Sequence, residues 1–329
     1  MKVLVTGASG FLGNNVVKVL ATEGHDVVAV VRDERKGGIF SNSPGVTVFI
    51  AGLDDIPALT AAAAGCDAVV HTAADTRMWP SQSAEQHTVN VEFTRNMIAV
   101  ARGASIGKFI HVSTVNTLRP GSRKEEPGTE EFVETNIAHP LGYVSSKRLA
   151  QALVLEAARD GLPAVVVNPS FMLGPGDFKP SSGALLLALH RGKVPGYTSG
   201  GRNFVHVRDV AAGILAAIAN GQPGECYILG HQNLLYREFF DIATGILGKK
   251  RIRLFLPGWL AVGYGWANVA WNRVSGKAPS LSHHMARAAG EVQFYSPEKA
   301  VRELGLPQTP VETAVRETLE WFGQQGMLT

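Results

Sequence analysis

Short runs of β-branched and other apolar residues alternate with longer amphipathic stretches through the first half of the chain. The runs predict strands at residues 3–6, 26–31, 46–50, 68–71, 109–113 and 164–168. The stretches between them predict helices at residues 13–23, 56–64, 90–102 and 145–160. Because the predicted strands show little alternation, both faces of their sheet should be covered. The order therefore predicts an α/β fold, a doubly wound parallel sheet with right-handed crossovers.

The pattern changes after Pro169. Residues 174–201 are rich in Gly, Pro and Ser, residues 203–218 resume a strand-then-helix pattern, and the remainder is more helical. We therefore expect one domain made of residues 1–170 and 204–231, in which the last segment returns to the sheet. Residues 171–203 and 232–329 should form a smaller, mainly helical C-terminal part. A ligand cleft between the two would lie at the carboxyl ends of the strands.

Composition and charge indicate an ordinary globular protein and give no sign of a nucleic-acid-binding, metal-binding or disulfide-rich one. Of 329 residues, 45% are hydrophobic and 18% are charged, as in ordinary globular proteins. The formal net charge of +3 gives no support for nucleic-acid binding. Cys66 and Cys226 fit neither a metal site nor a disulfide framework, so we expect buried thiols and no metal. A strand and a glycine turn begin at once, which leaves no signal peptide and predicts a cytoplasmic protein.

One segment, residues 254–271 (LFLPGWLAVGYGWANVAW), is mostly apolar and follows Lys249, Lys250, Arg251 and Arg253. A proline, three glycines and an asparagine interrupt it, so it lacks the roughly 18 clean apolar residues of a spanning helix. Two interpretations stay open. The segment lines an apolar pocket, or its aromatic residues make weak contact with a membrane surface beside the basic ones.

The first predicted strand runs directly into TGASGFLG, residues 6–13, and then into a helix. Glycine is required where the chain turns tightly, where backbone approaches a pyrophosphate, and where the helix packs on the strand. The phosphates would lie at the helix N-terminus, where free N–H groups and the helix dipole favour an anion. The order of strand, glycines and helix predicts a Rossmann domain that binds a dinucleotide.

The end of the second strand bears on which dinucleotide binds. An NAD site usually has a carboxylate there for the ribose hydroxyls, but this strand ends in Val31 and Arg32. The planar guanidinium of Arg32 is suited to a 2′-phosphate, with Arg35 and Lys36 close by in the sequence. We therefore predict NADP(H) in preference to NAD. The alternative is that Arg32 is a solvated loop charge.

Tyr143 and Lys147 are four residues apart at the start of a predicted helix, so they lie on one face. A close ammonium stabilises a phenolate and lowers its pKa, which suits the phenol to exchange a proton with a carbonyl oxygen. Ser113 and Thr114 bring hydroxyls to the end of the fifth strand. Such a Tyr/Lys pair alone is common on helix surfaces, but after a dinucleotide turn it predicts an oxidoreductase.

Nearly the whole chain resembles the extended short-chain dehydrogenase/reductase superfamily. The resemblance rests on TGASGFLG, the Tyr143/Lys147 pair, the Ser/Thr end of the fifth strand, NVEFTRN (90–96) and NPSFMLGPGD (168–177). Later landmarks are FVHVRDV (204–210), GECYILG (224–230) and YSPEKAVRELG (295–305). Within the superfamily, the chain is most similar to the dihydroflavonol-4-reductase-like group, which includes 3β-hydroxysteroid dehydrogenases.

The resemblance implies a role for each matching residue. Tyr143 would be the general acid/base, Lys147 would lower its pKa and bind the nicotinamide ribose, and Thr114 would be the catalytic hydroxyl with Ser113 in reserve. The pyrophosphate would be cradled by Gly7, Gly10, Phe11, Leu12 and Gly13, and the nicotinamide half bordered by Ala73, Ala74 and Pro169. Relatives commonly form homodimers through helices equivalent to residues 90–102 and 145–160. One departure is Gly52, where the family usually has an Asp on the adenine; Asp54 or Asp55 would have to replace it.

The residues expected around the small-molecule substrate are Met78, Trp79, Phe171, Met172, Tyr197 and Arg202, together with the Trp-rich residues 259–271. Apolar and aromatic walls suit a hydrophobic or aromatic ketone or aldehyde, so we expect an NADP(H)-dependent carbonyl reductase. A sugar-nucleotide epimerase or dehydratase with retained cofactor is the alternative. Arg202 favours it, because epimerases often place an Arg there on the substrate diphosphate, whereas VNTL (115–118), VNPS (167–170) and Arg32 oppose it. A catalytically silent, NADP-sensing interaction protein is a third hypothesis, opposed by the presence of both Tyr143 and Lys147.

Overall fold

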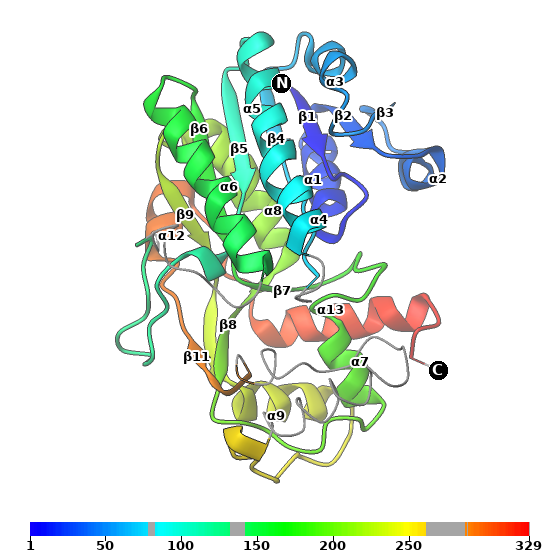
Figure 1. Ribbon diagram of the computed structural model, residues 1–329. Helices are drawn as coiled ribbons and strands as arrows, with labels where there is room; N and C mark the ends of the chain where they lie inside the picture. Colours follow the sequence, from blue (N-terminus) through cyan, green and yellow to red (C-terminus); the bar gives the residue numbers. More distant parts are fainter. Residues whose placement is uncertain (78–82, 132–141, 261–286, 288, 329) are drawn as a thin grey trace.

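The computed structural model describes residues 1–77, 83–131, 142–260, 287 and 289–328. Its main sheet has seven parallel strands in the order β3-β2-β1-β4-β5-β6-β9 (Figure 1). They are β1 (Lys2–Thr6), β2 (Asp26–Val31), β3 (Val46–Ile50), β4 (Ala68–His71), β5 (Lys108–Val112), β6 (Ala164–Pro169) and β9 (Cys226–Leu229). The doubly wound α/β fold is thereby confirmed. The strand order reverses between β1 and β4, which is where such folds bind ligands.

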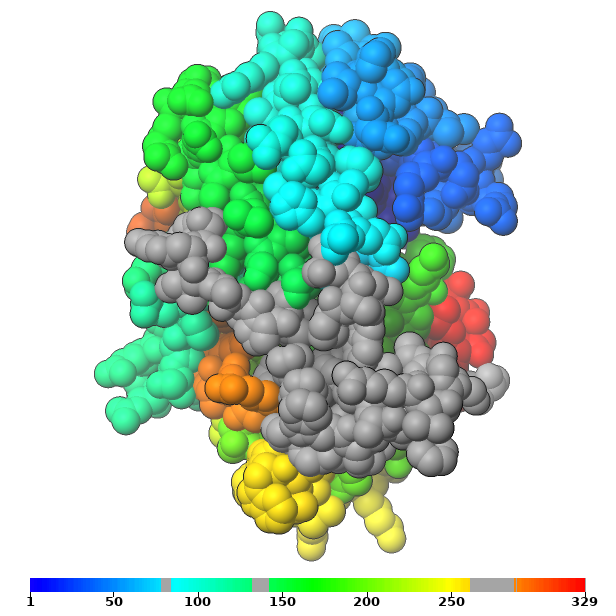
Figure 2. Space-filling view, viewed as in Figure 1, coloured from blue at the N-terminus to red at the C-terminus, as the bar shows by residue number. Residues whose placement is uncertain are grey.

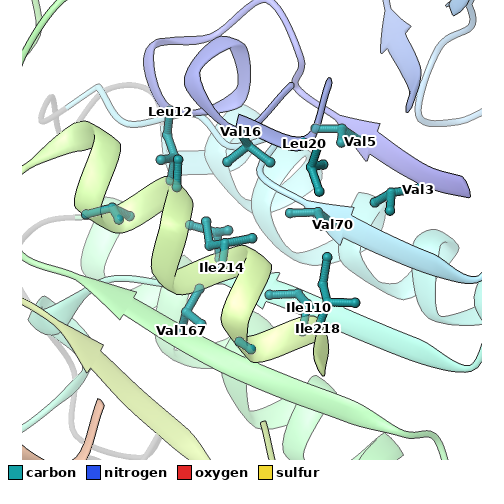
Figure 3. Close-up of a cluster of buried hydrophobic side chains, with 14 of the residues drawn as sticks. Val3, Val5, Leu12, Val16, Leu20, Val70, Ile110, Val167, Ile214 and Ile218 are labelled. Atoms are coloured by element: carbon teal, nitrogen blue, oxygen red, sulfur yellow. The ribbon is translucent and has the colours of Figure 1, made fainter. Parts of the chain in front are cut away.

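Helices cover both faces of this sheet. On one face lie α1 (Phe11–Thr22) and α8 (Val207–Asn220), and Figure 3 shows Leu12, Val16 and Ile214 of these helices packed with Val70 and Ile110 of the strands. The other face is covered by α3 (Ile56–Ala63), α5 (Phe93–Gly103) and α6 (Gly142–Arg159). Because the side chains of the inner strands are buried on both sides, those strands are mainly apolar in sequence, whereas the edge strand β3 is partly exposed.

Shorter elements complete this part of the molecule. They are α2 (Glu34–Gly37), α4 (Ser83–His87), α12 (Glu298–Leu304) and two 3-10 turns at Gly38–Phe40 and Val115–Thr117. A π-helical turn, Thr88–Glu92, joins α4 to α5, so the helix predicted at residues 90–102 starts earlier. Likewise α6 starts at Gly142 and not at residue 145, which places Tyr143 inside its first turn.

A second, four-stranded sheet lies below the main one in Figure 1. It contains β7 (Phe171–Leu173), β8 (Gly201–His206), β10 (Gln232–Leu235) and β11 (Val292–Gln293), with α7 (Ala184–His190), α9 (Tyr236–Ile246) and α13 (Val311–Gln324) beside it. Residues 204–206, predicted to return to the main sheet, belong to this small sheet because Phe204 pairs with Phe171 and Gln232. The rest of that segment, α8 and β9, does return to the main sheet. The division into two domains stays a prediction.

Within the described parts of the chain, no helix has the length and apolar character needed to cross a membrane.

Candidate active site

The glycine turn between β1 and α1 is tightly packed and has no side-chain cap. Gly7 has a left-handed backbone (φ 68°), and a Cβ there would lie 2.7 Å from the backbone nitrogen of Ala73. A Cβ on Gly13 would lie 2.1 Å from the carbonyl oxygen of Gly7. Gly10 precedes α1, whose amino end has no side-chain cap and no acidic residue in its first turn. The turn therefore leaves backbone N–H groups of Phe11 and Leu12 for an anion, which fits a pyrophosphate.

Arg32 lies directly after β2, exposed at the carboxyl end of the strand next to β1. The adjacent carboxylate, Asp33, is engaged with α2: it accepts a hydrogen bond of 3.1 Å from the Lys36 N–H and lies 3.6 Å from the Lys36 ammonium. The end of β2, the strand next to β1, therefore carries an exposed guanidinium. That arrangement fits a cofactor with an additional phosphate on its ribose.

The two carboxylates near Gly52 have different surroundings. Asp55 caps α3 by accepting a hydrogen bond of 3.0 Å from the Ala58 N–H. Asp54 folds back instead, so that a Cβ on Gly52 would lie only 2.3 Å from its carboxylate oxygen Oδ1. Gly52 stands where the family usually has an Asp, and Asp54 or Asp55 would have to take over its role. Only the Asp54 carboxylate lies beside Gly52 in the structure.

Tyr143 and Lys147 are both buried on the same face of α6. The Lys147 nitrogen Nζ donates a hydrogen bond of 2.8 Å to the carbonyl oxygen of Val112, the last residue of β5. Tyr143 forms a side-chain hydrogen bond with Thr114, two residues beyond that strand. The structure thus brings together the three side chains that the sequence singles out for catalysis.

The hydroxyl of Thr114 is held in a defined orientation. Its oxygen accepts a hydrogen bond of 3.3 Å from the Asn116 N–H, as the cap of the turn Val115–Thr117. Its own O–H is then free to donate to the Tyr143 oxygen, which lowers the phenol pKa. The hydroxyl of Ser113 is also buried but has no hydrogen-bond partner among the residues that the structure describes. The contact with Tyr143 supports Thr114 rather than Ser113 as the working hydroxyl.

Burial is the largest cause of the pKa shifts of Tyr143 and Lys147 in the protein without cofactor. Burial lowers the pKa of Lys147 to about 7. Burial also raises the pKa of Tyr143 to about 12, against the opposing effect of the Thr114 hydrogen bond. The sequence argument expects the Lys147 ammonium to lower the phenol pKa. In the protein by itself, burial is the largest cause of the Tyr143 shift, because desolvation disfavours the charged forms of both side chains.

Two neutral histidines lie on the same side of the sheet, next to Lys147. His71 Nδ1 lies 2.7 Å from the Thr6 hydroxyl, and the His71 ring centroid lies 5.7 Å from that of His111. Burial, followed by the charge of Lys147, lowers the pKa of His71 to about 3 and that of His111 well below its ordinary value. Both rings are therefore uncharged near neutral pH and add no positive charge around Lys147.

A buried amide network supports the end of β5. Asn168 Nδ2 donates to the Thr114 carbonyl oxygen (2.9 Å), the Thr117 hydroxyl (3.0 Å) and Gln151 Oε1 (3.0 Å). The Thr117 hydroxyl also contacts Gln151 Oε1 at 2.8 Å. Gln151 lies one turn beyond Lys147 on α6. The network therefore fixes Thr114 relative to the helix that carries Tyr143, a role that sequence reasoning missed.

Asn90, in the π-helical turn, connects the loop after β4 to α6. Its Oδ1 accepts a hydrogen bond of 2.7 Å from the Asp75 N–H, and its Nδ2 donates to the Asp75 carbonyl oxygen (3.0 Å) and the Ser146 hydroxyl (2.9 Å). Ser146 in turn donates to the carbonyl oxygen of Tyr143 (2.9 Å). Sequence reasoning names Asn90 only as part of a motif. Its contacts show that it links two parts of the site: the loop that carries Ala73 and Ala74, predicted to border the nicotinamide, and the helical turn that carries Tyr143.

The described residues among those predicted around the substrate come from several elements. Met78, Trp79 and residues 261–271 lie outside the described residues. Phe171 and Met172 lie in β7, which is separated from Pro169 at the end of β6 by Ser170 alone. Tyr197 packs on Phe255 with ring centroids 5.8 Å apart.

Arg202, on β8, donates from Nε to the Tyr236 hydroxyl at 3.1 Å. Together with Arg148 of α6, it also exerts a charge effect on the buried Tyr295. Two arginines from different elements thus lie near one phenol, and Tyr295 itself packs on Val115 and Leu118, just beyond Thr114.

No group of acidic, His and Cys side chains among the described residues could hold a metal ion. Cys66 and Cys226 are buried free thiols, as predicted.

Comparison with known proteins agrees with this geometry. The sequence model of the NAD dependent epimerase/dehydratase family matches residues 3–230. This chain belongs to that family. The resemblance to extended short-chain dehydrogenases/reductases is thereby confirmed, and the chain is an oxidoreductase of the type that acts on CH–OH groups.

Similar proteins include reductases and a sterol enzyme. A putative dihydroflavonol 4-reductase of Synechocystis sp. is 32% identical over 328 residues, covering 98% of this chain and 94% of that protein. The sterol demethylase protein B of Methylococcus capsulatus is 28% identical and is matched over 100% of both chains. The crystal structure of gox2253 superposes with a TM-score of 0.84 at 33% identity, covering 99% of each chain.

Proposed function

We propose that this epimerase/dehydratase family member is an NADP(H)-dependent oxidoreductase that transfers hydride between nicotinamide and a hydrophobic or aromatic ketone or aldehyde. The observation that carries the proposal is the convergence of three buried side chains, Thr114, Tyr143 and Lys147, at the carboxyl end of β5, where Lys147 is hydrogen-bonded to the Val112 carbonyl oxygen at 2.8 Å. A glycine turn suited to a pyrophosphate lies at the same edge of the sheet.

The protonation state of Tyr143 suits the direction of carbonyl reduction. With a pKa of about 12, the phenol holds its proton at neutral pH and can donate it to a carbonyl oxygen. Bound NADPH would supply the hydride to the carbonyl carbon, so that the product is an alcohol. Thr114, oriented by Asn116, would hydrogen-bond the same oxygen, and Tyr143 would then recover a proton from solvent.

The choice of cofactor rests on Arg32. Its guanidinium is exposed at the end of β2, and the neighbouring Asp33 carboxylate is engaged by Lys36. A 2′-phosphate would form charge-assisted hydrogen bonds with Arg32, whereas the 2′-hydroxyl of NAD finds no such carboxylate partner at this position. Gly7, Gly10, Phe11, Leu12 and Gly13 would hold the pyrophosphate, and Lys147 the nicotinamide ribose.

Two lines of support favour an apolar substrate. The side chains of Phe171 and Met172, just beyond Pro169, are partly exposed and apolar. The similar proteins named above include a dihydroflavonol reductase and a sterol enzyme, whose names denote large, mainly hydrocarbon or aromatic molecules. A ketone of that kind would bury its apolar surface against such walls.

The proposal is tested by NADPH oxidation with a panel of hydrophobic and aromatic ketones. The wild-type chain should consume NADPH with at least one of them, and Tyr143→Phe should still bind NADPH but lose turnover by about a hundredfold or more. Tyr227→Phe is the matched control, because that buried phenol contacts the Gln222 N–H far from Thr114. Near-normal kcat in Tyr143→Phe would refute the catalytic role.

A second candidate is a sugar-nucleotide epimerase or dehydratase with retained cofactor. The observation that favours it is the pair Arg148 and Arg202 near Tyr295, since two guanidinium groups suit a diphosphate. Turnover of a UDP-sugar without net change in NADPH or NADP would support this alternative. Net oxidation of NADPH by a ketone supports the first.

A further inference from the structure

A basic stretch followed by an apolar one forms an exposed surface at residues 249–260. Lys249, Lys250, Arg251 and Arg253 are all exposed. The exposed fractions of the apolar side chains that follow are 56% for Leu254, 48% for Phe255, 73% for Trp259 and 45% for Leu260. In Figure 2 this yellow segment lies at the end of the molecule, away from the blue N-terminal part. Large apolar side chains gathered in this way on the surface of a soluble protein usually mark an interaction site.

The surface is held in place by backbone contacts. The Tyr197 N–H donates to the Leu254 carbonyl oxygen (2.9 Å), and the Leu256 N–H donates to the Tyr197 carbonyl oxygen (2.8 Å). The Phe255 ring packs on the Tyr197 ring, and the Arg237 guanidinium lies 5.9 Å from the centre of the Tyr197 ring. The backbone of Leu254 and Leu256 is thus held against Tyr197, while the side chains of Leu254 and Phe255 stay exposed.

A basic pocket adjoins these apolar side chains. It measures about 350 Å³ and is lined by Tyr197, Arg237, Asp241, Arg251, Ile252 and Arg253. Three arginines face one carboxylate, Asp241, whose Oδ1 lies 3.9 Å from the Nε of Arg251. The net positive charge of this lining suits an anionic phosphate group.

We propose that the surface at residues 249–260 docks on a membrane that contains anionic phospholipids. Arg237, Arg251 and Arg253 would bind a headgroup phosphate, while Leu254, Phe255 and Trp259 enter the boundary between headgroups and acyl chains. Aromatic and aliphatic side chains beside basic ones are the combination that binds such interfaces. The proposal goes beyond the reaction and does not depend on it.

The test is co-sedimentation of the full chain with lipid vesicles. Vesicles of phosphatidylcholine alone are compared with vesicles of phosphatidylcholine and phosphatidylglycerol in equal amounts. Binding to the mixed vesicles should be stronger by about tenfold or more and should weaken as salt is raised, because the basic side chains are screened. Equal binding to both kinds of vesicle, or none to either, would overturn the proposal.

Two double variants separate the apolar contribution to vesicle binding from the basic one. The double variant Phe255→Ser/Trp259→Ser, and the double variant Arg251→Gln/Arg253→Gln, should each reduce binding to mixed vesicles by about tenfold. Ile39→Ser and Arg302→Gln are the controls, since these side chains are exposed elsewhere on the molecule (40% and 71%). Thermal unfolding of each variant checks that it folds, and the binding readout needs no turnover, so failure here is distinct from failure of the proposed reaction.

Other occupants of the surface give distinct outcomes. If the serine double variant converts an oligomer into a monomer by light scattering while vesicle binding is absent, the surface joins copies of this chain and the proposal fails. If inorganic phosphate raises the unfolding temperature of the wild-type chain but not that of Arg251→Gln/Arg253→Gln, while mixed vesicles do not bind, the pocket binds free phosphate and the proposal also fails. Vesicle binding that persists in phosphate buffer supports docking on lipid.

Discussion

The side-chain nitrogen of Lys147 donates a hydrogen bond of 2.8 Å to the carbonyl oxygen of Val112, the last residue of β5. This contact connects α6 to the strand that leads into Thr114, so one buried amine helps to set the distance between the two catalytic elements. Its surroundings are apolar or neutral: burial lowers the pKa of Lys147 to about 7, and His71, His111 and Tyr143 are uncharged near it. Protonated, charged Lys147 therefore destabilises the folded state.

The destabilising charge on buried Lys147 predicts how the free energy of unfolding depends on pH. Between pH 7 and the ordinary lysine pKa of 10.5, the unfolded chain holds a proton on Lys147 that the folded chain has lost. The unfolded state then binds more protons, so the free energy of unfolding rises with pH across that window, by an amount on the order of a few kcal/mol. Thermal unfolding from pH 7 to pH 9 should show this rise, and Lys147→Met should abolish most of it.

The exposed Lys18 supplies the control, since Lys18→Met should keep the pH dependence of the wild type. Above pH 10 the sign reverses for Tyr143. Its folded pKa of about 12 exceeds the ordinary value of 10, so the folded chain then binds more protons and stability falls. A wild-type unfolding free energy that stays flat or falls between pH 7 and pH 9, as in Lys147→Met, would contradict the buried-lysine account.

Thr114 should act through its hydroxyl. Thr114→Val removes the donor to Tyr143 and should lower kcat by about a hundredfold, with little change in NADPH binding. Thr114→Ser keeps the hydroxyl and should retain most of the activity. Ser113→Ala should also remain within about tenfold of wild type, because no described residue hydrogen-bonds that hydroxyl. The reverse ranking, with Ser113→Ala the more damaged variant, would assign the role to Ser113.

Asn90 should matter for stability and activity together. Asn90→Ala leaves the buried N–H of Asp75 without its acceptor and removes the donor to Ser146, at a cost of about 1–3 kcal/mol in the free energy of unfolding. Because Ser146 supports the turn of Tyr143, kcat should fall as well. Asn96→Ala is the control, since Asn96 makes one hydrogen bond to the Leu53 carbonyl oxygen and should cost less. Equal effects of the two variants in urea unfolding would argue against the linking role.

The fold could be predicted because its signals are local. Each strand of the main sheet is a short, mainly apolar run, and the glycine turn occupies consecutive residues. Both can therefore be recognised in the sequence without knowledge of tertiary contacts. The strands of the small sheet cannot be recognised in this way. Three of its four described strands have four residues or fewer, and pairs such as Phe171 with Phe204 bring together residues far apart in the sequence. For the same reason the sequence pattern places residues 204–206 in the main sheet, whereas they pair within the small one.

The site could be predicted in part. Tyr143, Lys147 and Thr114 follow from helical spacing and from the end of a strand, and they do converge. Their protonation could not be predicted, because burial is the largest cause of the Tyr143 pKa shift and the spacing of residues in the sequence does not reveal it. The supporting contacts of Asn90 and Asn168 also escape sequence reasoning, since their partners come from other elements. Cytoplasmic location and a homodimer stay predictions.

Cofactor preference should depend on Arg32. Arg32→Ser removes the guanidinium at the end of β2 and should lower the ratio of kcat/KM for NADPH to that for NADH by about 10- to 100-fold, the value of one or two charge-assisted hydrogen bonds. Arg35→Ser should have a smaller effect, because Arg35 lies within α2 and not at the strand end. Equal use of both cofactors by the wild-type chain would sink the assignment to NADP(H).

Gly13 should be intolerant of even one added methyl group. A Cβ at this position would lie 2.1 Å from the carbonyl oxygen of Gly7, an atom of the backbone that the turn itself holds in place. Gly13→Ala should therefore lower the unfolding temperature and weaken NADPH binding by about tenfold or more, since α1 must move off the turn to make room. Gly245→Ala is the matched helical control: Gly245 lies in α9 with no atom within 4 Å of an added Cβ, so the change should be neutral or stabilising by up to about 1 kcal/mol. Isothermal titration with NADPH and thermal unfolding of both variants decide the matter. Normal binding in Gly13→Ala would mean that the close packing of turn and helix is not what shapes the phosphate site.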